Sequence, residues 1–210
     1  MPRMPDMPDQ PLNLDGDPVK PRQAATVIVL QGGSDALEVL LVQRNPEQRF
    51  MGGAWVFPGG AVDTEDGDND DQHRIAGVRE VMEEASVTLP DPHALIPYSR
   101  WITPAQVAVR FDTHFFLVRA PADVAPAVDG HECVDWAWWN PGEAIKANER
   151  HELLLAFPTI KTLDGLSQFE SADALLDWAA GRTVEPIEPR VVVEGEVSRV
   201  VLPGEPGYVD

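Results

Sequence analysis

The stretch REVMEEASV, residues 79–87, gathers three glutamates within five positions beside one arginine. A helix turns about 100° per residue, so Glu80, Glu83 and Glu84 share one face. Arg79 lies about 100° from Glu80, where its guanidinium can hold one or two carboxylates. The apolar residues of the helix fall on the opposite side and are predicted to pack on a sheet: Ile75, Val78, Met82 and Ala85. The stretch therefore predicts a helix with a one-sided carboxylate cluster.

The residues before this helix bear on what the cluster is for. A solvated acidic face is the ordinary explanation, because glutamate is a good helix former. Only one arginine serves the three glutamates, however, so pairing does not explain all of them. In addition, FPGG (57–60) overlaps AWVF (54–57), which is predicted to be a short buried strand. Gly59 and Gly60 permit a turn in which the backbone closely approaches another group. Because backbone carbonyl and carboxylate oxygens suit Mg²⁺ or Mn²⁺, the sequence favours a cation site here.

The rest of the chain mixes strand and helix patterns. The apolar, β-branched runs at 25–31 and 38–44 predict a hairpin, and the runs at 112–120 and 133–139 predict two further strands. Helices are predicted at 72–85, from Pro141 onward, at 152–157 and at 171–181, and a late hairpin at 190–202. Asp70 and Asp71 are the candidates for the N-cap of the first helix. This order favours an α/β or α+β fold with a mixed sheet over a doubly wound parallel one.

Composition limits the partners. The chain has 210 residues, 43% of them hydrophobic, and a formal net charge of −19. A nucleic-acid backbone or an anionic membrane is therefore not expected as the main partner, because both are negative. The single cysteine, Cys133, excludes an internal disulfide and suits a cytoplasmic location. Residues 1–22 are rich in proline and aspartate and lack an apolar core, so a flexible tail is expected rather than a secretory signal.

The run from Gly60 to Val87 resembles the Nudix box, G-x5-E-x7-R-E-U-x-E-E-x-G-U, where U is aliphatic. REVMEEASV agrees with the second half of this pattern at every specified position but one, where Ser86 takes the place of glycine. The spacing from Gly60 to Arg79 is 19 residues instead of 14, which indicates a five-residue insertion. Counting back from Arg79 puts Asp71 in the first acidic position. The acidic loop 63–72 is expected to be a lid over the metal site or a disordered excursion, and its charge favours disorder, or order only when metal is bound.

The flanking sequences RFMGGAWVFPGGAVD, RFDTHFF, FPTIKTL and LPGEPGY are similar to those of a long-loop Nudix subgroup that includes the peroxisomal coenzyme A diphosphatase branch. This resemblance implies an α/β/α sandwich with a mixed β-sheet. The expected organisation is a flexible tail (1–22), a Nudix domain (23–168) and a helical and hairpin extension (169–210) packed on the same domain. A homodimer is left open.

The resemblance also implies a chemistry: metal-dependent hydrolysis of the diphosphate linkage of a nucleoside diphosphate derivative, with coenzyme A, ADP-ribose and NADH as alternative substrates. It makes Glu80 and Glu84 metal ligands, with Glu83 serving a second metal and the Gly59 carbonyl completing the first site. Arg79 is expected to orient the carboxylates. A protein that kept the fold as a nucleotide-binding or regulatory module and lost catalysis is the competing hypothesis.

Three further residues are candidates on weaker grounds. Glu132, which lies on a predicted loop before the strand at 133–139, competes with Glu80 for the role of catalytic base. Arg44 ends a predicted strand and Arg49 precedes FMGG, so both are candidates for binding a substrate phosphate. For each of the three, a simple surface position is the alternative.

Overall fold

The computed structural model describes residues 13, 17–48, 51–89, 91–194 and 197–208. The strands of its large sheet are β1 (Arg22–Gln31), β2 (Glu38–Arg44), β3 (Trp55–Val56), β4 (Gly59–Ala61), β5 (Ile96–Ile102), β6 (Phe111–Arg119), β7 (Cys133–Trp139) and β8 (Pro186–Ile187). The helices are α1 (Gln72–Ala85), α2 (Pro141–Glu149), α3 (Phe157–Leu166) and α4 (Ala172–Ala179), with short 3₁₀ turns η1 (Thr64–Asp66) and η2 (Pro92–Ala94). A separate hairpin follows, β9 (Arg190–Glu194) and β10 (Val197–Val201).

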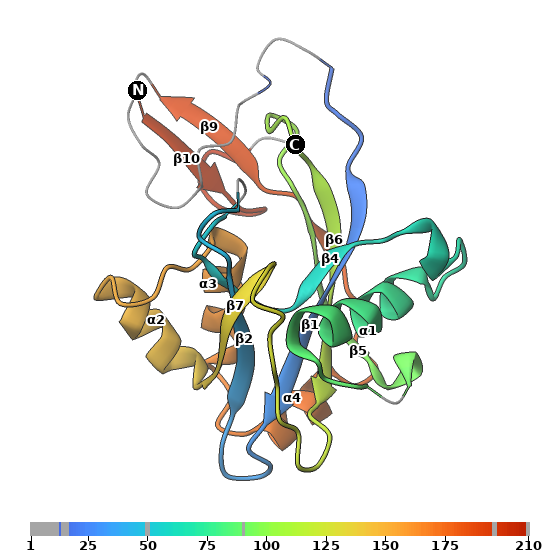
Figure 1. The fold of residues 1–210 in the computed structure, drawn as a ribbon. Helices are drawn as coiled ribbons and strands as arrows, with labels where there is room; N and C mark the ends of the chain where they lie inside the picture. The colour runs from blue at the N-terminus through green and yellow to red at the C-terminus, as the bar shows by residue number, and fades with distance from the viewer. Residues whose placement is uncertain (1–12, 14–16, 49–50, 90, 195–196, 209–210) are drawn as a thin grey trace.

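Strand β1 is central, and its two edges are used differently. One edge runs parallel to β6 along nearly its whole length. On the other edge, the first part of β1 pairs antiparallel with β4, and its last two residues pair antiparallel with β2. The predicted hairpin of β1 and β2 is confirmed, but its strands pair only beside the turn and then diverge (Figure 1). This mixed sheet confirms the predicted fold class.

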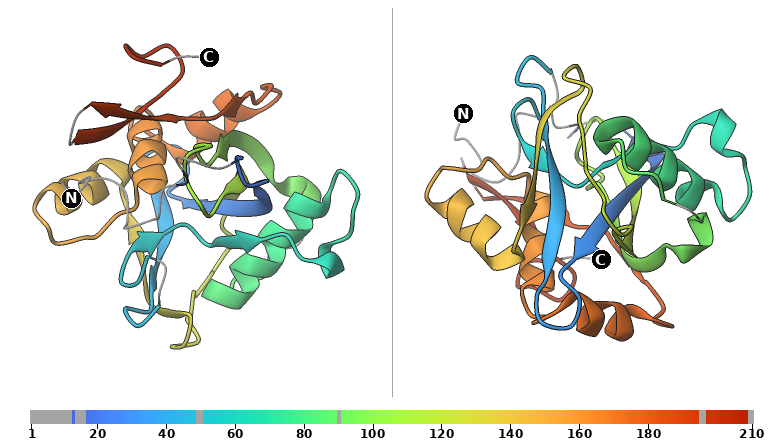
Figure 2. Two further views of the ribbon diagram at one scale, coloured as in Figure 1. Left: turned by 90° about the horizontal axis from the view of Figure 1, so that it is seen from above. Right: turned by 60° about the horizontal axis from the view of Figure 1, so that its bottom comes forward.

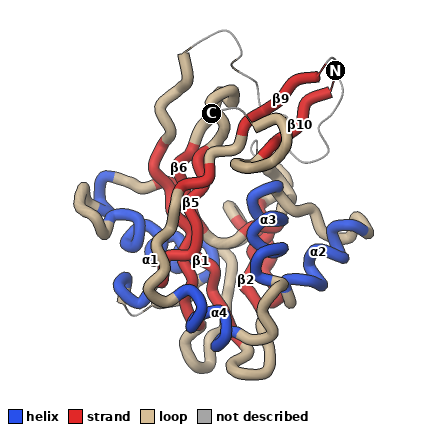
Figure 3. Tube along the Cα trace, turned by 180° about the vertical axis from the view of Figure 1, so that it is seen from behind, coloured by secondary structure: helices blue, strands red, loops and turns tan. Residues whose placement is uncertain are grey.

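Helices cover both faces of the sheet, as Figures 1 and 3 show. Alternation along β1 explains the two cores, because successive side chains of a strand point to opposite faces. Val27 and Val29 belong to the core under α1, whereas Ile28 and Leu30 belong to the core shared with α2, α3 and α4. The layers therefore form the α/β/α sandwich that the sequence predicts.

Helix α1 has the predicted bounds, and the predicted Val78 and Ala85 do pack on the core, but the packing face is rotated toward Glu84 and away from Met82. Its buried residues are Ala76, Gly77, Val81, Glu84 and Ala85. Met82, predicted to be buried, is 49% exposed. A Cβ on Gly77 would lie 2.8 Å from Val27 Cγ2, so this glycine lets the helix approach β1 closely. The prediction was wrong because it assigned Glu84 to the solvent-facing side of the helix.

Two other local predictions need correction. Residues 152–157 do not form a helix; Leu155 makes a parallel bridge to Trp55, and α3 begins only at Phe157. The glycines after β3 do not form a turn but the short strand β4 against β1. In contrast, α2 begins at Pro141 as predicted, and Ser171 caps α4 by accepting a hydrogen bond from the Ala174 N–H.

The C-terminal segment is tied to the sheet and the core. Strand β8 runs parallel to β5, and Ala172, Leu175 and Ala179 of α4 lie in the same core as α2 and α3. The guanidinium of Arg110 donates to Glu188 at 2.8 Å, just before the hairpin, which lies above α3 in Figure 2. The hairpin predicted at 190–202 is confirmed by the antiparallel pairing of β9 and β10, whereas Gly195 and most of the predicted tail 1–22 fall outside the described residues. No helix among the described residues is long and apolar enough to cross a membrane.

Candidate active site

Arg79 is the centre of a network that joins α1 to the segment before it. Its Nη1 donates to Glu80 Oε1 at 2.8 Å and to Glu83 Oε2 at 2.9 Å. Its Nη2 donates to the Ala61 carbonyl at 3.0 Å and to Asp66 Oδ2 at 2.9 Å, and its Nε donates to Asp66 Oδ1 at 3.1 Å. These contacts, the Asp66 bonds above all, raise the pKa of Arg79. Arg79 therefore fixes two carboxylates of the box while being held bidentately by a third acid.

Asp66 was missed by the sequence analysis. It is 2% exposed, accepts the Asp63 N–H at 2.8 Å, and has its pKa lowered chiefly by the hydrogen bonds from Arg79. Counting forward from Gly60 instead of back from Arg79 puts Asp66 in the first acidic position of the box. This forward count was therefore the sequence signal that could have identified Asp66.

Asp71, to which that position was assigned, has a different place. It stands at the N-cap of α1, but its side chain makes no capping hydrogen bond and lies 3.9 Å from the Arg74 guanidinium. The five inserted residues are therefore 67–71, between Asp66 and the helix. The expectation of a disordered or metal-ordered loop at 63–72 is wrong for its first half, because Asp66 is buried there against Arg79.

Glu84 is almost completely buried, at 3% exposed. Its Oε2 accepts the Gly59 N–H at 2.9 Å, and its Oε1 lies 3.8 Å from Arg44 Nη1. Burial raises the pKa of Glu84 to about 8 against the opposing effects of the Gly59 hydrogen bond and Arg44, while the nearby Glu80 raises it further. Glu84 therefore links α1 to β4 and to the end of β2.

Glu80 lies against the backbone of β4. A Cβ on Gly60 would lie 2.4 Å from Glu80 Oε1, so a larger residue there would displace the carboxylate from this position. Burial raises the pKa of Glu80 and Arg79 opposes the change. Gly59 is constrained as well, since a Cβ there would overlap the Ala25 carbonyl. The two glycines therefore allow a carboxylate helix and a sheet edge to meet.

The helix ends as a glycine-terminated helix would, although residue 86 is serine. Ser86 has φ 54° and ψ 29°, the left-handed conformation, and its N–H donates to the Met82 carbonyl at 3.0 Å. The Val87 N–H reaches the Val81 carbonyl at 3.4 Å. The turn that the box requires is therefore kept, with a strained serine in it.

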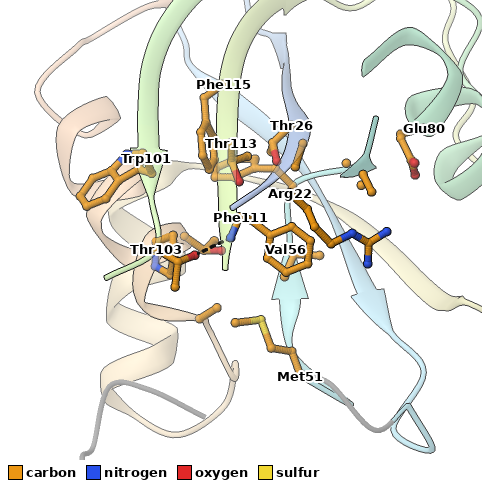
Figure 4. Close-up of a pocket in the computed structure, with 18 of the residues that line it drawn as sticks. Arg22, Thr26, Met51, Val56, Glu80, Trp101, Thr103, Phe111, Thr113 and Phe115 are labelled. Atoms are coloured by element: carbon orange, nitrogen blue, oxygen red, sulfur yellow. Dashed lines mark hydrogen bonds between the residues drawn. The ribbon is translucent and has the colours of Figure 1, made fainter. Parts of the chain in front are cut away.

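A cavity of about 590 Å³ opens beside the carboxylates. Glu80, Glu83, Gly59 and Gly60 line one end of it. The rest has an apolar, largely aromatic lining that comes from β3, β5, β6 and α3, part of which Figure 4 shows: Val56, Trp101, Phe111, Phe115 and Phe157. Pro189 and Val200 bring the C-terminal segment to its wall. The cavity thus joins a charged end to a larger apolar part.

Two of the weaker candidates meet at the cavity. Arg44 pairs with Cys133 in the sheet, and the Asn45 N–H donates to the Glu132 carbonyl at 2.9 Å. This pairing brings Arg44 Nη2 within 3.6 Å of Glu132 Oε1, and both residues line the cavity. Glu132 is half-exposed there, with its side chain 54% accessible. Arg49 lies outside the described residues.

The donor set of the site fits a hard divalent cation. Among the described residues, the two arginines Arg44 and Arg79 face six carboxylates: Asp63, Asp66, Glu80, Glu83, Glu84 and Glu132. Within the described ranges, no three acidic, histidine or cysteine side chains converge closely enough to hold a metal as they stand. Glu80 and Glu83 are turned toward Arg79, so rotation of these two side chains would be needed. The negative excess and the oxygen ligands suit Mg²⁺ or Mn²⁺.

The α/β/α layers and the carboxylate helix against a glycine strand define a protein of the Nudix-fold class. The family model described as NUDIX domain matches residues 20–157. The chain therefore belongs to the NUDIX family and is a Nudix-type hydrolase. It is 25% identical to the human acyl-coenzyme A diphosphatase NUDT19, over 92% of this chain and 82% of that protein. It is 32% identical to the peroxisomal coenzyme A diphosphatase ndx-8 of Caenorhabditis elegans, over 64% and 54% respectively.

The fold is shared with solved structures. A NUDIX hydrolase from Alicyclobacillus acidocaldarius superposes with a TM-score of 0.67 at 25% identity, covering 75% of this chain and 96% of that one. The predicted family and fold are therefore confirmed, whereas the individual residue roles remain predictions.

Proposed function

We propose that this chain is a divalent-cation-dependent diphosphatase that cleaves the diphosphate linkage of coenzyme A or an acyl-coenzyme A. The observation that carries the proposal is the cavity, with box carboxylates at one end and an apolar, aromatic part beyond them. A diphosphate is held at an acidic site only through cations, and the pantetheine and acyl portions of such a substrate need apolar walls. The names of the human and nematode relatives support the same substrate class.

Glu80, Glu84 and Glu83, with the Gly59 carbonyl, would hold the cation, either Mg²⁺ or Mn²⁺. When bound, the cation neutralises diphosphate charge and activates water. Arg79 positions Glu80 and Glu83 and is itself fixed by Asp66. We assign the proton-accepting role to Glu132 or Glu80, both of which line the cavity. Arg44 beside Glu132 is the candidate contact for a substrate phosphate.

The test is a substrate panel of coenzyme A, an acyl-coenzyme A, ADP-ribose and NADH, incubated with Mg²⁺, with Mn²⁺ or with a chelator. We expect cation-dependent release of a 3′,5′-phosphorylated adenosine product from the coenzyme A compounds. Glu84→Gln should lower turnover by at least about 100-fold, in the range seen when one group essential for transition-state stabilisation is removed. The matched control is Glu149→Gln, on the exposed end of α2.

Three results would contradict the proposal. Turnover unaffected by the chelator would contradict the proposed dependence on a cation. Full activity of a folded Glu84→Gln variant would contradict the proposed role of Glu84 in the site. Cleavage of ADP-ribose or NADH without cleavage of coenzyme A would overturn the substrate class. Circular dichroism and thermal unfolding of each variant establish that it is folded.

A further inference from the structure

The floor of the cavity is formed by one face of β1 and β6. The two strands are parallel and in register, with Arg22 opposite Phe111, Ala24 opposite Thr113, and Thr26 opposite Phe115. Because side chains alternate between faces, these residues point to the same side, away from α1. Figure 4 shows Arg22 projecting from this floor beside Phe111 and Val56. Arg22 and Phe111 therefore stand at the outer end of the floor.

Among the described residues, three arginines line the cavity, and two of these are engaged by acids. Arg79 is held by Asp66, Glu80 and Glu83, and Arg44 lies near Glu84 and Glu132. Arg22 makes no ion pair with any described residue. Its guanidinium lies 5.8 Å from the centre of the Phe111 ring. In a chain with 35 acidic and 16 basic residues, a cavity-lining arginine without a carboxylate partner is the group left for an anion of the ligand.

The position of Arg22 separates it from the carboxylate end of the site. Gly60, which touches the Glu80 carboxylate, pairs with Ala25 of β1. Ala25 lies three residues beyond Arg22, which is about 10 Å of extended strand. The backbone of Arg22 is therefore displaced along β1 from the strand position that lies beside the carboxylates.

The geometry points to Arg22 as a specificity-determining residue that binds a phosphate monoester of the substrate outside the scissile diphosphate. The inference rests on the proposed function and narrows it to nucleotides that carry such an additional phosphate, as coenzyme A does on its ribose. Phe111 orients the guanidinium from the neighbouring strand, so that its planar donors are presented to the cavity. The enzyme thereby distinguishes substrates that share a diphosphate but differ in one phosphate monoester.

A matched pair of substrates tests this. Coenzyme A and 3′-dephospho-coenzyme A differ only in the phosphate monoester, and the variant is Arg22→Gln. We expect the KM of coenzyme A to rise roughly 10-fold, the scale of a charge-assisted hydrogen bond at a partly solvated site, with kcat little changed. The kinetics of 3′-dephospho-coenzyme A should stay as in the wild type, and Arg22→Lys should recover part of the loss. Arg150→Gln, on an exposed loop, is the control.

Equal losses on both substrates, or no loss on either, would overturn the inference. Binding measurements make it independent of turnover: adenosine 3′,5′-bisphosphate should bind the wild type roughly 10-fold more tightly than adenosine 5′-monophosphate, and Arg22→Gln should remove the difference. A wild type that cleaves neither coenzyme A compound would overturn the proposed function, whereas equal binding of the two nucleotides would overturn the role of Arg22. The two failures are therefore distinguishable.

Discussion

Replacing Asp66 with alanine tests whether this buried acid, and not Asp71, occupies the first acidic position of the box. Asp66 is 2% exposed and accepts hydrogen bonds from Arg79 at 2.9 and 3.1 Å and from the Asp63 N–H at 2.8 Å. Removing one partner of a buried pair costs about 3 to 5 kcal/mol. Arg79 is partly exposed and keeps its bonds to Glu80 and Glu83, so we reduce this to about 2 to 4 kcal/mol for Asp66→Ala.

Asp71→Ala is the matched control. The Asp71 side chain is 43% exposed, caps no N–H group and lies 3.9 Å from its arginine neighbour, so we expect a loss of less than about 0.5 kcal/mol. Urea unfolding followed by tryptophan fluorescence measures both variants, since the chain has six tryptophans. Only a shifted midpoint with an unchanged slope counts as a change in stability.

The lowered pKa of Asp66 sets the pH dependence of the stability difference between wild type and Asp66→Ala. Arg79 lowers the pKa of Asp66 in the folded chain, so the stabilisation is present above the unfolded value of 3.8 and is lost only as pH falls through the lower folded value. The difference between wild type and variant should therefore be constant from about pH 6 to 8. A loss for Asp71→Ala as large as for Asp66→Ala, or a loss below about 1 kcal/mol for Asp66→Ala, would refute the reasoning.

Three further changes have defined outcomes. Ser86→Gly should raise the free energy of unfolding by about 1 kcal/mol in urea titrations, because glycine relieves the left-handed strain; unchanged or lower stability would contradict this. Gly60→Ala should lower turnover at least about tenfold by displacing the Glu80 carboxylate, whereas Gly142→Ala, in the first turn of α2, should leave it unchanged; equal effects would argue against the overlap. Burial lowers the pKa of His114 to about 4 from 6.5. The contribution of neutral His114 to the free energy of unfolding is therefore complete above pH 6.5 and falls by about 1 to 2 kcal/mol by pH 5. A His114→Phe variant, measured at both pH values, should not show this loss.

The local sequence pattern was enough to predict those features of the fold that depend only on residues close together in the chain. The bounds of α1, the order of its carboxylates and the pairing strands of the first hairpin follow from periodicity and turn residues, and the structure has them. The packing face of α1 does not follow from periodicity. Glu84 is buried because the Gly59 N–H, 25 residues away, meets its carboxylate, and this rotates the apolar Met82 to the surface.

Pattern also failed where tertiary pairing replaced local propensity. The apolar run at 152–157 has the composition of a helix, but Leu155 forms a parallel β-bridge with Trp55 of β3 instead. The phosphate-binding role inferred for Arg22 had no counterpart in the sequence analysis either. An arginine at the start of a strand becomes notable only when its register with Phe111 is known and no ion pair joins it to an acid in the described part of the chain.

The five-residue insertion shows how the box tolerates change in length. Three hydrogen-bonded contacts tie the strand side of the motif to α1: Asp66 binds Arg79, Arg79 donates to the Ala61 carbonyl, and the Gly59 N–H binds Glu84. Residues 67–71 lie between the first of these contacts and the helix, so they lengthen the loop from Asp66 to Arg79 without entering the carboxylate cluster. Increasing that separation from 8 to 13 residues costs about 0.4 kcal/mol in loop-closure entropy. This is several times less than the expected contribution of Asp66, so the ion pair holds the motif in register across a loop of variable length.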